Sequence, residues 1–288
     1  MIGWLIYQKK DAEENLSYIE WFQAEAKKQQ IELILFYREE LAVGVSHKAY
    51  EIYINGYAQP LPDFIVNRSI EPVLQDFFHT CHIPIFNDGE TARIANHKAL
   101  THLELSKLNI PMLPTFFIHG RALPNKLPLP YPVMIKAVSG RGGKEVYFID
   151  YDTSWKEFRR HATNQEYIVQ STNVQLGKDV RVFVIGREII AAVLRYNKND
   201  FRANFKLGGK AIPYTLSQED RQMIDRITNR FQFGLVGIDF LMNHDGKLLF
   251  NEIEDVAGSR ILSEVTDINL LEKYIHFIKK HVRDKRAK

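Results

Sequence analysis

An acidic hairpin near the carboxyl end of the chain constrains the fold more than any other segment. Two apolar stretches flank Asp245 and Gly246, and an Asp-Gly pair between apolar runs is a strong signal of two antiparallel strands. If these residues are the two turn centres, both at positive φ, Asp239 lies directly opposite Glu252. Directly opposed residues share one face of a hairpin, and Glu254 returns to that face two residues later. The pattern therefore predicts that three carboxylates converge.

The three acids, Asp239, Glu252 and Glu254, carry like charges that repel one another unless a cation lies among them. Mg²⁺ suits carboxylate oxygens and completes its shell with substrate phosphates. We therefore expect these side chains to bind Mg²⁺. A loop longer by one residue on each side would still leave the acids on one face. The plainer interpretation is a solvated strand face, which fits less well because apolar residues alternate with the acid in the first strand.

A glycine-rich segment at residues 139–145 lies between two strand-like stretches, and phosphate is its expected ligand. Glycine lets backbone N–H groups approach an anion closely, and two basic side chains add positive charge. The spacing and the strand that follows differ from a P-loop and from a Rossmann turn. An ordinary flexible turn is the alternative, but Lys136 lies in the apolar strand just upstream and needs an anionic partner. The segment comprises Ser139, Gly140, Arg141, Gly142, Gly143, Lys144 and Glu145.

The order of strand-like and helix-like segments predicts three parts. Residues 1–90 alternate strands with helices, which is typical of a small α/β domain with a parallel sheet. A central part at 91–175 starts with a helix and a proline-rich boundary and carries the glycine-rich segment. Residues 176–288 hold two hairpins, the acidic one included, and a final helix.

Bulk composition excludes several classes of protein. The chain has 288 residues, with 38 Lys and Arg against 35 Asp and Glu, a balance too even for a dedicated nucleic-acid binder. The single cysteine, Cys81, allows no intrachain disulfide. The short apolar run at the amino terminus is neither a signal peptide nor a membrane span. We expect a cytoplasmic protein with no membrane and no nucleic-acid partner.

The order of these motifs resembles one known superfamily. After the Lys136 strand and the glycine-rich segment come Gln170, Asp-Val-Arg-Val-Phe-Val-Ile-Gly at 179–186, Arg-Ala-Asn-Phe-Lys-Leu-Gly-Gly at 202–209, and the acidic hairpin. From about Lys98 to the final helix, this order is similar to the RimK-type branch of the ATP-grasp superfamily. That branch includes ligases that add glutamate to ribosomal protein tails and carrier-protein ligases of lysine biosynthesis. The resemblance implies an ATP-grasp fold of the α/β (α+β) class, with an N-terminal parallel-sheet lobe and two lobes that enclose a nucleotide.

The resemblance also implies roles for individual residues. Ser171 and Thr172 fall where the linker accepts adenine through its backbone, and Lys136, Arg202 and Asn204 act in catalysis. Asp239, Glu252 and Glu254 match the metal ligands, although Glu254 stands where asparagine is common. The loop at 255–260 departs from the family pattern, which favours a different substrate. The implied nucleotide site comprises Lys98, Lys136, Ser139, Gly140, Arg141, Gly142, Gly143, Gln170, Ser171, Thr172, Asp179, Arg202 and Asn204.

The implied activity is that of an ATP-dependent ligase, which forms a C–N bond between a carboxylate and an amine through an acyl-phosphate. We expect it to attach an amino acid such as glutamate to a protein, peptide or small-molecule acceptor. ATP and one or two Mg²⁺ are the expected cofactors, with Mn²⁺ as a second candidate metal. Arg68 and Arg260 are candidates for binding a substrate carboxylate, because guanidinium groups match carboxylates. A homo-oligomer is expected from similar proteins. The alternatives are an ATP-grasp nucleotide-binding regulator or pseudoenzyme, and an ATP-grasp kinase.

Overall fold

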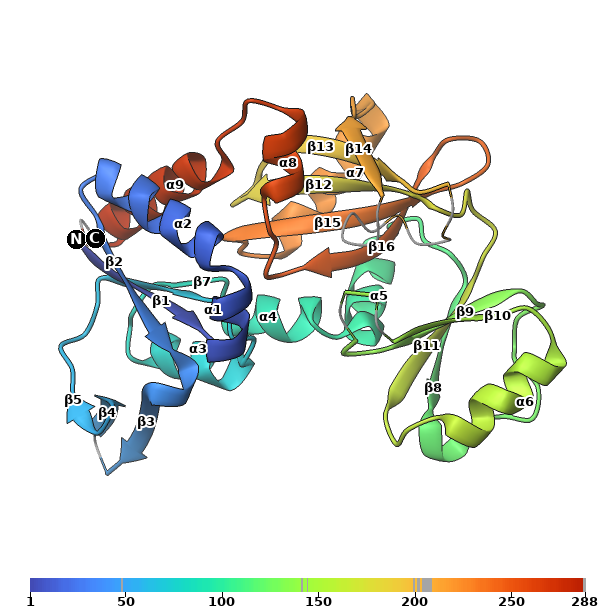
Figure 1. Ribbon diagram of the computed structural model, residues 1–288, viewed down its shortest axis with the longest axis horizontal. Helices are drawn as coiled ribbons and strands as arrows, with labels where there is room; N and C mark the ends of the chain where they lie inside the picture. The colour runs from blue at the N-terminus through green and yellow to red at the C-terminus, as the bar shows by residue number, and fades with distance from the viewer. Residues whose placement is uncertain are drawn as a thin grey trace.

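The computed structural model describes residues 1–47, 49–140, 142–143, 145–198, 200, 203 and 209–286, whose strands form four sheets. Figure 1 shows a parallel sheet at one end of the molecule, the antiparallel sheet of the central region at the other, and a five-stranded sheet above and between them. This mixture of sheets and helices confirms the expected α/β (α+β) class. None of the described helices is long and apolar enough to cross a membrane.

The amino-terminal sheet is parallel throughout, as predicted. Its strands lie in the order β2 (Glu32–Tyr37), β1 (Ile2–Tyr7), β6 (Phe64–Asn67) and β7 (Ile85–Phe86). Helices α1 (Lys9–Glu14) and α2 (Leu16–Lys28) connect β1 to β2, and α3 (Pro72–Thr80) connects β6 to β7, as parallel pairing requires. The sequence predicted one helix over 11–30, but Asn15 separates two helices because its backbone N–H turns back to the carbonyl of Ala12.

A small antiparallel sheet follows β2 and projects from this lobe (Figure 1). After a 3-10 turn, η1 (Arg38–Glu40), the chain forms β3 (Leu41–Ser46), β4 (Ala49–Ile54) and β5 (Tyr57–Ala58). Asn55 and Gly56 both have positive φ, at 50° and 80°. They form the tight turn that this pair of residues predicts.

The central region forms a separate antiparallel sheet. Its order is β10 (Val146–Ile149), β9 (Val133–Ala137), β11 (Glu166–Ser171) and β8 (Thr115–His119), with η2 (Gly120–Ala122) after β8. Helix α6 (Asp152–His161) packs Trp155 and Phe158 into the core of this sheet. Strand β8 lies within the proline-rich stretch predicted as a boundary. It forms because Pro114 and Pro124 flank the strand and do not interrupt it.

The carboxyl-terminal part is built on the five-stranded antiparallel sheet. Its order is β14 (Lys210–Pro213), β13 (Glu188–Tyr196), β12 (Lys178–Ile185), β15 (Leu235–Met242) and β16 (Leu248–Glu254). One face packs against α4 (Gly89–Ala95), α5 (Lys98–Ser106) and α7 (Gln218–Arg230). Helices α8 (Arg260–Val265) and α9 (Leu270–Arg286) contribute to a second core on the other face.

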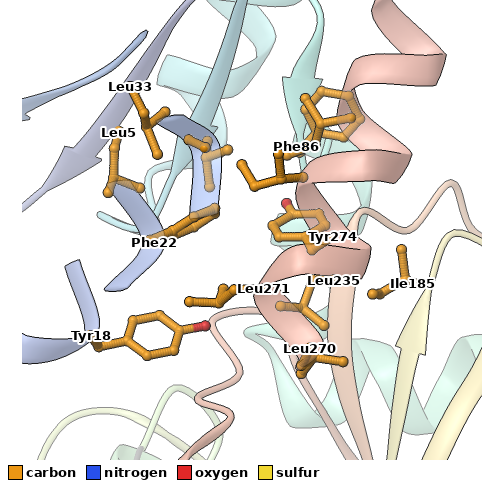
Figure 2. Packing of buried hydrophobic residues seen from close by; sticks show 14 of the residues in the cluster. Leu5, Tyr18, Phe22, Leu33, Phe86, Ile185, Leu235, Leu270, Leu271 and Tyr274 are labelled. Carbon is orange, nitrogen blue, oxygen red and sulfur yellow. The ribbon is translucent and has the colours of Figure 1, made fainter. Parts of the chain in front are cut away.

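That second core joins the two ends of the chain. Figure 2 shows Leu271 and Tyr274 of α9 close to Phe22 of α2, with Ile185 and Leu235 of the five-stranded sheet on the other side of the helix. The amino-terminal sheet is therefore packed against the five-stranded sheet through α9. The division at residues 90 and 175 stays a prediction, since the hydrophobic clusters cross both positions.

Candidate functional site

Strands β15 and β16 form the acidic hairpin, but its turn differs from the predicted one. The N–H of Asn243 donates to the carbonyl of Lys247 (2.9 Å), and only Gly246 of the turn residues has positive φ (82°). Asn243 Oδ1 accepts from the backbone N–H groups of Asp245 (3.0 Å) and Lys247 (2.8 Å). The predicted two-residue turn is wrong, because the Asn243 side chain stabilises a turn with three residues between Asn243 and Lys247.

A β-bulge in β16 restores the predicted pairing of the acids. The register pairs Phe240 with Phe250 but Asp239 with Glu252, so Asn251 is the extra residue. Without the bulge, the longer turn would place Asn251 opposite Asp239 and would turn Glu252 to the other face of the sheet. Asp239 and Glu252 therefore lie opposite each other as predicted, and Asn251 lies beside them.

Two arginines on neighbouring strands pair with Asp239 and with two further acids. Arg181 of β12 donates to both oxygens of Asp239, with 2.7 Å for each hydrogen bond, and also contacts Glu254. Arg195 of β13 donates to Asp239 (2.8 Å) and to both oxygens of Asp179 (2.5 and 2.9 Å). Strand pairing explains these contacts, because Arg181 lies opposite Asp239, and Arg195 lies opposite Asp179.

Burial and the ion pairs act in opposite directions on the pKa values of this network. Burial would raise the pKa of Asp239, but Arg181 and Arg195 more than offset it and hold the pKa well below its usual range. At Asp179 burial prevails over Arg195, and the pKa is raised. Burial would lower the pKa of Arg181, yet Asp239 and Glu254 raise it well above its ordinary value. Asp239 and Arg181 therefore stay charged at neutral pH.

The three predicted metal ligands lie along one hairpin, and each of them pairs with a cationic side chain of the protein. Arg181 contacts both Asp239 and Glu254, and Lys98 Nζ lies 3.4 Å from Glu252 Oε2. Within the described ranges, no three His, Cys, Asp or Glu side chains form a group that could hold a metal ion. The donors nevertheless fit Mg²⁺ in kind, since they are hard oxygens. The side chains of Glu252 and Glu254 are 35% and 42% exposed, so they are accessible to an ion that arrives with a ligand.

Lys136 of β9 faces the hairpin across a gap between two sheets. Its Nζ donates to Gln170 Oε1 (2.9 Å) and to Asn251 Oδ1 (2.8 Å), which are both neutral amides. Burial lowers the pKa of Lys136 to about 8, although Glu252 partly offsets this effect. None of the described carboxylates lies within ion-pair distance of this ammonium group. The anionic partner predicted for Lys136 is therefore not one of these side chains, which favours a bound phosphate.

His102 of α5 fixes the orientation of the Gln170 amide. His102 Nδ1 lies 2.8 Å from the carbonyl oxygen of Lys98, which can only accept, so this nitrogen carries the proton. Burial lowers the pKa of His102 to about 4, so the ring is neutral and Nε2 accepts. It accepts from Gln170 Nε2 (3.2 Å). The oxygen of the Gln170 amide consequently points at Lys136.

The glycine-rich segment lies beside the first residue of α5. Lys98 Nζ donates to the carbonyl of Gly140 (2.6 Å), and its backbone N–H donates to that of Val138 (3.1 Å). Gly142 and Gly143 have positive φ, at 61° and 72°, which glycine adopts without steric strain. A Cβ at Gly142 would meet nothing within 4 Å, so the backbone conformation and not crowding requires glycine there.

These groups line one pocket, which lies where the central sheet meets the acidic hairpin. Ser139 is exposed, and neither Ser139 nor Glu254 lines the pocket. Glu254 pairs with Arg181, which also pairs with the lining residue Asp239. Arg141, Arg202 and Asn204 lie outside the described residues. The predicted site residues that line the pocket are Lys98, Lys136, Gly140, Gly142, Gly143, Gln170, Ser171, Thr172, Asp179, Asp239 and Glu252.

The two arginines predicted to bind substrate lie apart from this lining. Arg68 follows β6 and is buried, and its Nη2 donates to the carbonyl oxygen of Ala257 (3.2 Å). Arg260 is exposed at the start of α8 and donates to Asn15 Oδ1 (3.1 Å). The structure thus places both near the loop after β16, but on its buried and exposed sides respectively.

Sequence reasoning missed four residues of the site, namely Asn251, Arg181, Arg195 and His102. Arg181 belongs to the Asp-Val-Arg motif, and His102 lies one helical turn after Lys98, so both had a signal in the sequence. Strict strand alternation predicts that Asn251 points away from the acids, and the bulge reverses that orientation.

The chain is similar to several known proteins. Residues 95–278 match the model of the RimK-like ATP-grasp domain. The chain is 31% identical over 209 residues to the α-aminoadipate–LysW ligase LysX of Saccharolobus solfataricus, which covers 68% of this chain and 76% of that protein. It is 33% identical over 160 residues to a probable α-L-glutamate ligase of Legionella pneumophila, or 53% of this chain and 51% of that protein. The fold is similar to that of the ATP-grasp ligase PsnB, solved with a precursor variant, Mg and ADP, with a TM-score of 0.72, 12% identity, and coverage of 97% and 98%.

The family match and the similar ligases identify the protein as an ATP-grasp ligase, an enzyme that uses ATP to join a carboxylate to an amine. More narrowly, the chain belongs to the RimK-like ATP-grasp family, which confirms the predicted superfamily and branch.

Proposed function

We propose that the protein activates the carboxylate of one substrate with ATP in this pocket and then joins it to an amino group. The observation that carries the residue assignments is the buried ammonium of Lys136, which has amide oxygens as partners and lies next to the acidic hairpin. An ammonium so placed stabilises a phosphate strongly, because the surrounding protein screens the charge poorly. Ser171 and Thr172 would receive adenine at one side of the pocket, and Lys98 would meet the phosphates with Lys136.

In the proposed reaction, a carboxylate oxygen attacks the γ-phosphorus, the bond to the β–γ bridging oxygen breaks, and ADP leaves. The amine then attacks the acyl carbon and inorganic phosphate leaves. Lys136 and Lys98 neutralise negative charge on the phosphoryl oxygens, while Gln170 and Asn251 hold the Lys136 ammonium in place. Alignment and charge stabilisation supply most of the rate in this chemistry. Arg202 and Asn204 keep the catalytic roles that the resemblance implies.

Glu252 and Glu254 would hold Mg²⁺ at the hairpin, with Asp239 as the third ligand. When bound with ATP, the ion supplies further neutralisation of the phosphate charge. Mn²⁺ has similar oxygen ligands and is a second candidate metal. Arg181 already pairs with Asp239 and Glu254, so it sets where their carboxylates lie before any ion arrives.

The proposed carboxylate or amine substrate is an amino acid such as glutamate or α-aminoadipate, and the acceptor is a protein, peptide or small molecule. The names of the two similar ligases support this range. A cytoplasmic location and a homo-oligomer stay predictions. The loop at 255–260 differs from the family pattern, so the acceptor is proposed to differ from those of the relatives.

A coupled ADP-release assay tests the proposal. Pairs of amino acids and small carboxylates are offered with Mg-ATP to the wild-type protein and to Glu252→Gln. Release that requires both a carboxylate and an amine, and that Glu252→Gln loses while its melting temperature persists, is the expected result. Release with a single hydroxyl substrate would indicate a kinase. ATP binding without release for any pair would indicate a nucleotide-binding regulator.

A further inference from the structure

A second polar cluster lies where the amino-terminal sheet meets the loop after β16. The guanidinium carbon of Arg68 is 5.5 Å from the ring centre of Tyr7 and 5.2 Å from that of Tyr18. Its Nη2 donates to the carbonyl oxygens of Val256 (3.3 Å) and Ala257 (3.2 Å). Tyr7 ends β1 and Arg68 follows β6, so both lie at the carboxyl ends of parallel strands. Ligands of α/β sheets commonly bind at that edge.

Several buried groups of this cluster have no hydrogen-bond partner. They are Nε of Arg68 and the hydroxyl groups of Tyr7 and Tyr18. None of these three residues is more than 9% exposed. The Tyr7 hydroxyl lies near the guanidinium but makes no hydrogen bond of normal geometry. Buried polar groups in folded proteins are nearly always paired, so several unpaired ones around one cation indicate that a partner binds there.

The charge of Arg68 has no anionic partner either. Among the described carboxylates, none lies within ion-pair distance of its guanidinium group. Asp255 contributes to its electrostatic surroundings, but it accepts from Asn87 (2.5 Å) and Asn96 (2.9 Å) instead. Burial raises the pKa of Tyr7 to about 12, so the hydroxyl keeps its proton at neutral pH and can donate. A permanent cation beside two buried hydroxyl groups that lack partners is complementary to an anion.

We infer that Arg68, Tyr7 and Tyr18 form a binding site for a substrate carboxylate that does not react. This inference rests on the proposed function, because it assigns the site to one of the two ligase substrates. Val256 follows Glu254 by two residues, so the carbonyl groups that accept from Arg68 belong to the loop that continues the acidic hairpin. A substrate with two charged groups could place its spectator carboxylate at Arg68 and its reacting group at the nucleotide pocket.

A ligand can reach Arg68 only if the loop at 256–258 moves away, because Arg68 Nη2 donates to two carbonyl oxygens of this loop. A bound carboxylate would take the place of these carbonyl oxygens and would accept from Nε and the hydroxyl groups as well. Charge-assisted bonds of this kind are stronger than those to neutral carbonyl groups.

Two phenol substitutions separate this site from a purely structural cluster. Tyr18→Phe and Tyr7→Phe each remove one unpaired hydroxyl and keep the ring. Tyr167→Phe is the matched control, because the equally buried Tyr167 hydroxyl accepts from the N–H of Thr163 (3.0 Å) and from Gln165 (3.2 Å). The measurements are the melting temperature without ligand and the Kd for L-glutamate, L-aspartate and L-α-aminoadipate, each compared with its α-carboxamide, with a non-hydrolysable ATP analogue present.

Tyr18→Phe and Tyr7→Phe should leave the ligand-free melting temperature unchanged or higher. They should also weaken binding of the preferred acid by about tenfold and reduce its preference over the carboxamide. Tyr167→Phe should lower the melting temperature and leave the Kd unchanged. The inference is overturned if both cluster variants lower the melting temperature with no change in Kd, or if none of the three acids binds the wild-type protein. The ligase proposal is decided separately by ADP release.

Discussion

Lys136 of β9 and Asn251 of β16 are joined by a 2.8 Å hydrogen bond that crosses from the central sheet to the five-stranded sheet. Asn251 reaches Lys136 because it is the bulged residue between Phe250 and Glu252. The amide holds the ammonium beside the acids without neutralising it. None of the described carboxylates pairs with this ammonium group, so a bound phosphate can supply the opposite charge.

Asn251→Asp should raise KM for ATP by about 10- to 100-fold, because the new carboxylate would pair with Lys136 and repel the phosphates. The two side chains have the same shape, so packing is preserved. Asn229→Asp makes the same chemical change on the exposed face of α7 and is the control. Steady-state kinetics at varied ATP provides the measurement, and equal KM values for the two variants would contradict the role given to Lys136.

ATP use should fall at alkaline pH. The pKa of Lys136 is lowered by burial from 10.5 to about 8, so the ammonium loses its proton above that pH and the phosphates lose a charged donor. The effect on stability has the opposite sign. Because the folded-state pKa is the lower one, the contribution of Lys136 to the free energy of unfolding rises with pH between about 8 and 10.5. In a profile of kcat/KM for ATP, Lys136→Arg should lack the limb near pH 8, and a limb that persists in this variant would exclude Lys136 as its source.

His102→Phe should raise KM for ATP by about two- to tenfold, the worth of one ordinary hydrogen bond. The phenyl ring can keep the edge-to-face contact with Phe250, but it offers no acceptor to Gln170. The NH₂ group would then keep only Thr115 Oγ1 as its acceptor (3.2 Å), and the amide would turn this group toward Lys136 more readily. His102→Gln, which keeps an acceptor, should restore much of the affinity. A loss of melting temperature with no change in KM would show that His102 acts only through packing.

Arg181→Met should lower the free energy of unfolding by about 3–5 kcal/mol, because it leaves Asp239 buried with half of its ion pairs. The pKa of Asp239 is held well below its usual range, so its stabilisation is complete above pH about 4 and is lost as pH falls through the lowered folded-state value. In the variant, acid unfolding should therefore begin at higher pH. Urea and acid titrations followed by circular dichroism measure both effects.

Arg187→Met is the control for this prediction, since Arg187 is exposed at the β12–β13 turn of the same sheet. It should change the free energy of unfolding by less than about 0.5 kcal/mol. Equal effects of the two substitutions would mean that the buried network contributes little to stability.

Much of the fold follows from local patterns in the sequence. The alternating segments before residue 90 predicted the parallel sheet, and the Asp-Gly pair predicted the acidic hairpin. The helix break at Asn15 was missed, because a backbone contact at that residue and not apolar periodicity decides the boundary. Strand β8 was missed because prolines on both sides obscured a short alternating run.

The site was predictable only where it depends on local register. Asp239 and Glu252 lie opposite each other as predicted, but only because two departures from the expected hairpin cancel each other. These departures are a longer turn and the bulge at Asn251. The roles of Arg181 and Arg195 depend on which strands become neighbours in the sheet, and a single sequence does not reveal that order. The unpaired cluster at Arg68 likewise requires the contact between the two ends of the chain.

The path of oxygen in the reaction tests the central claim most directly. With the carboxylate substrate labelled with ¹⁸O, ³¹P NMR of the released phosphate should show one labelled oxygen for each amide bond formed, because that oxygen attacks the γ-phosphorus and leaves with it. Unlabelled phosphate, or AMP and pyrophosphate as products, would contradict an acyl-phosphate formed in this pocket.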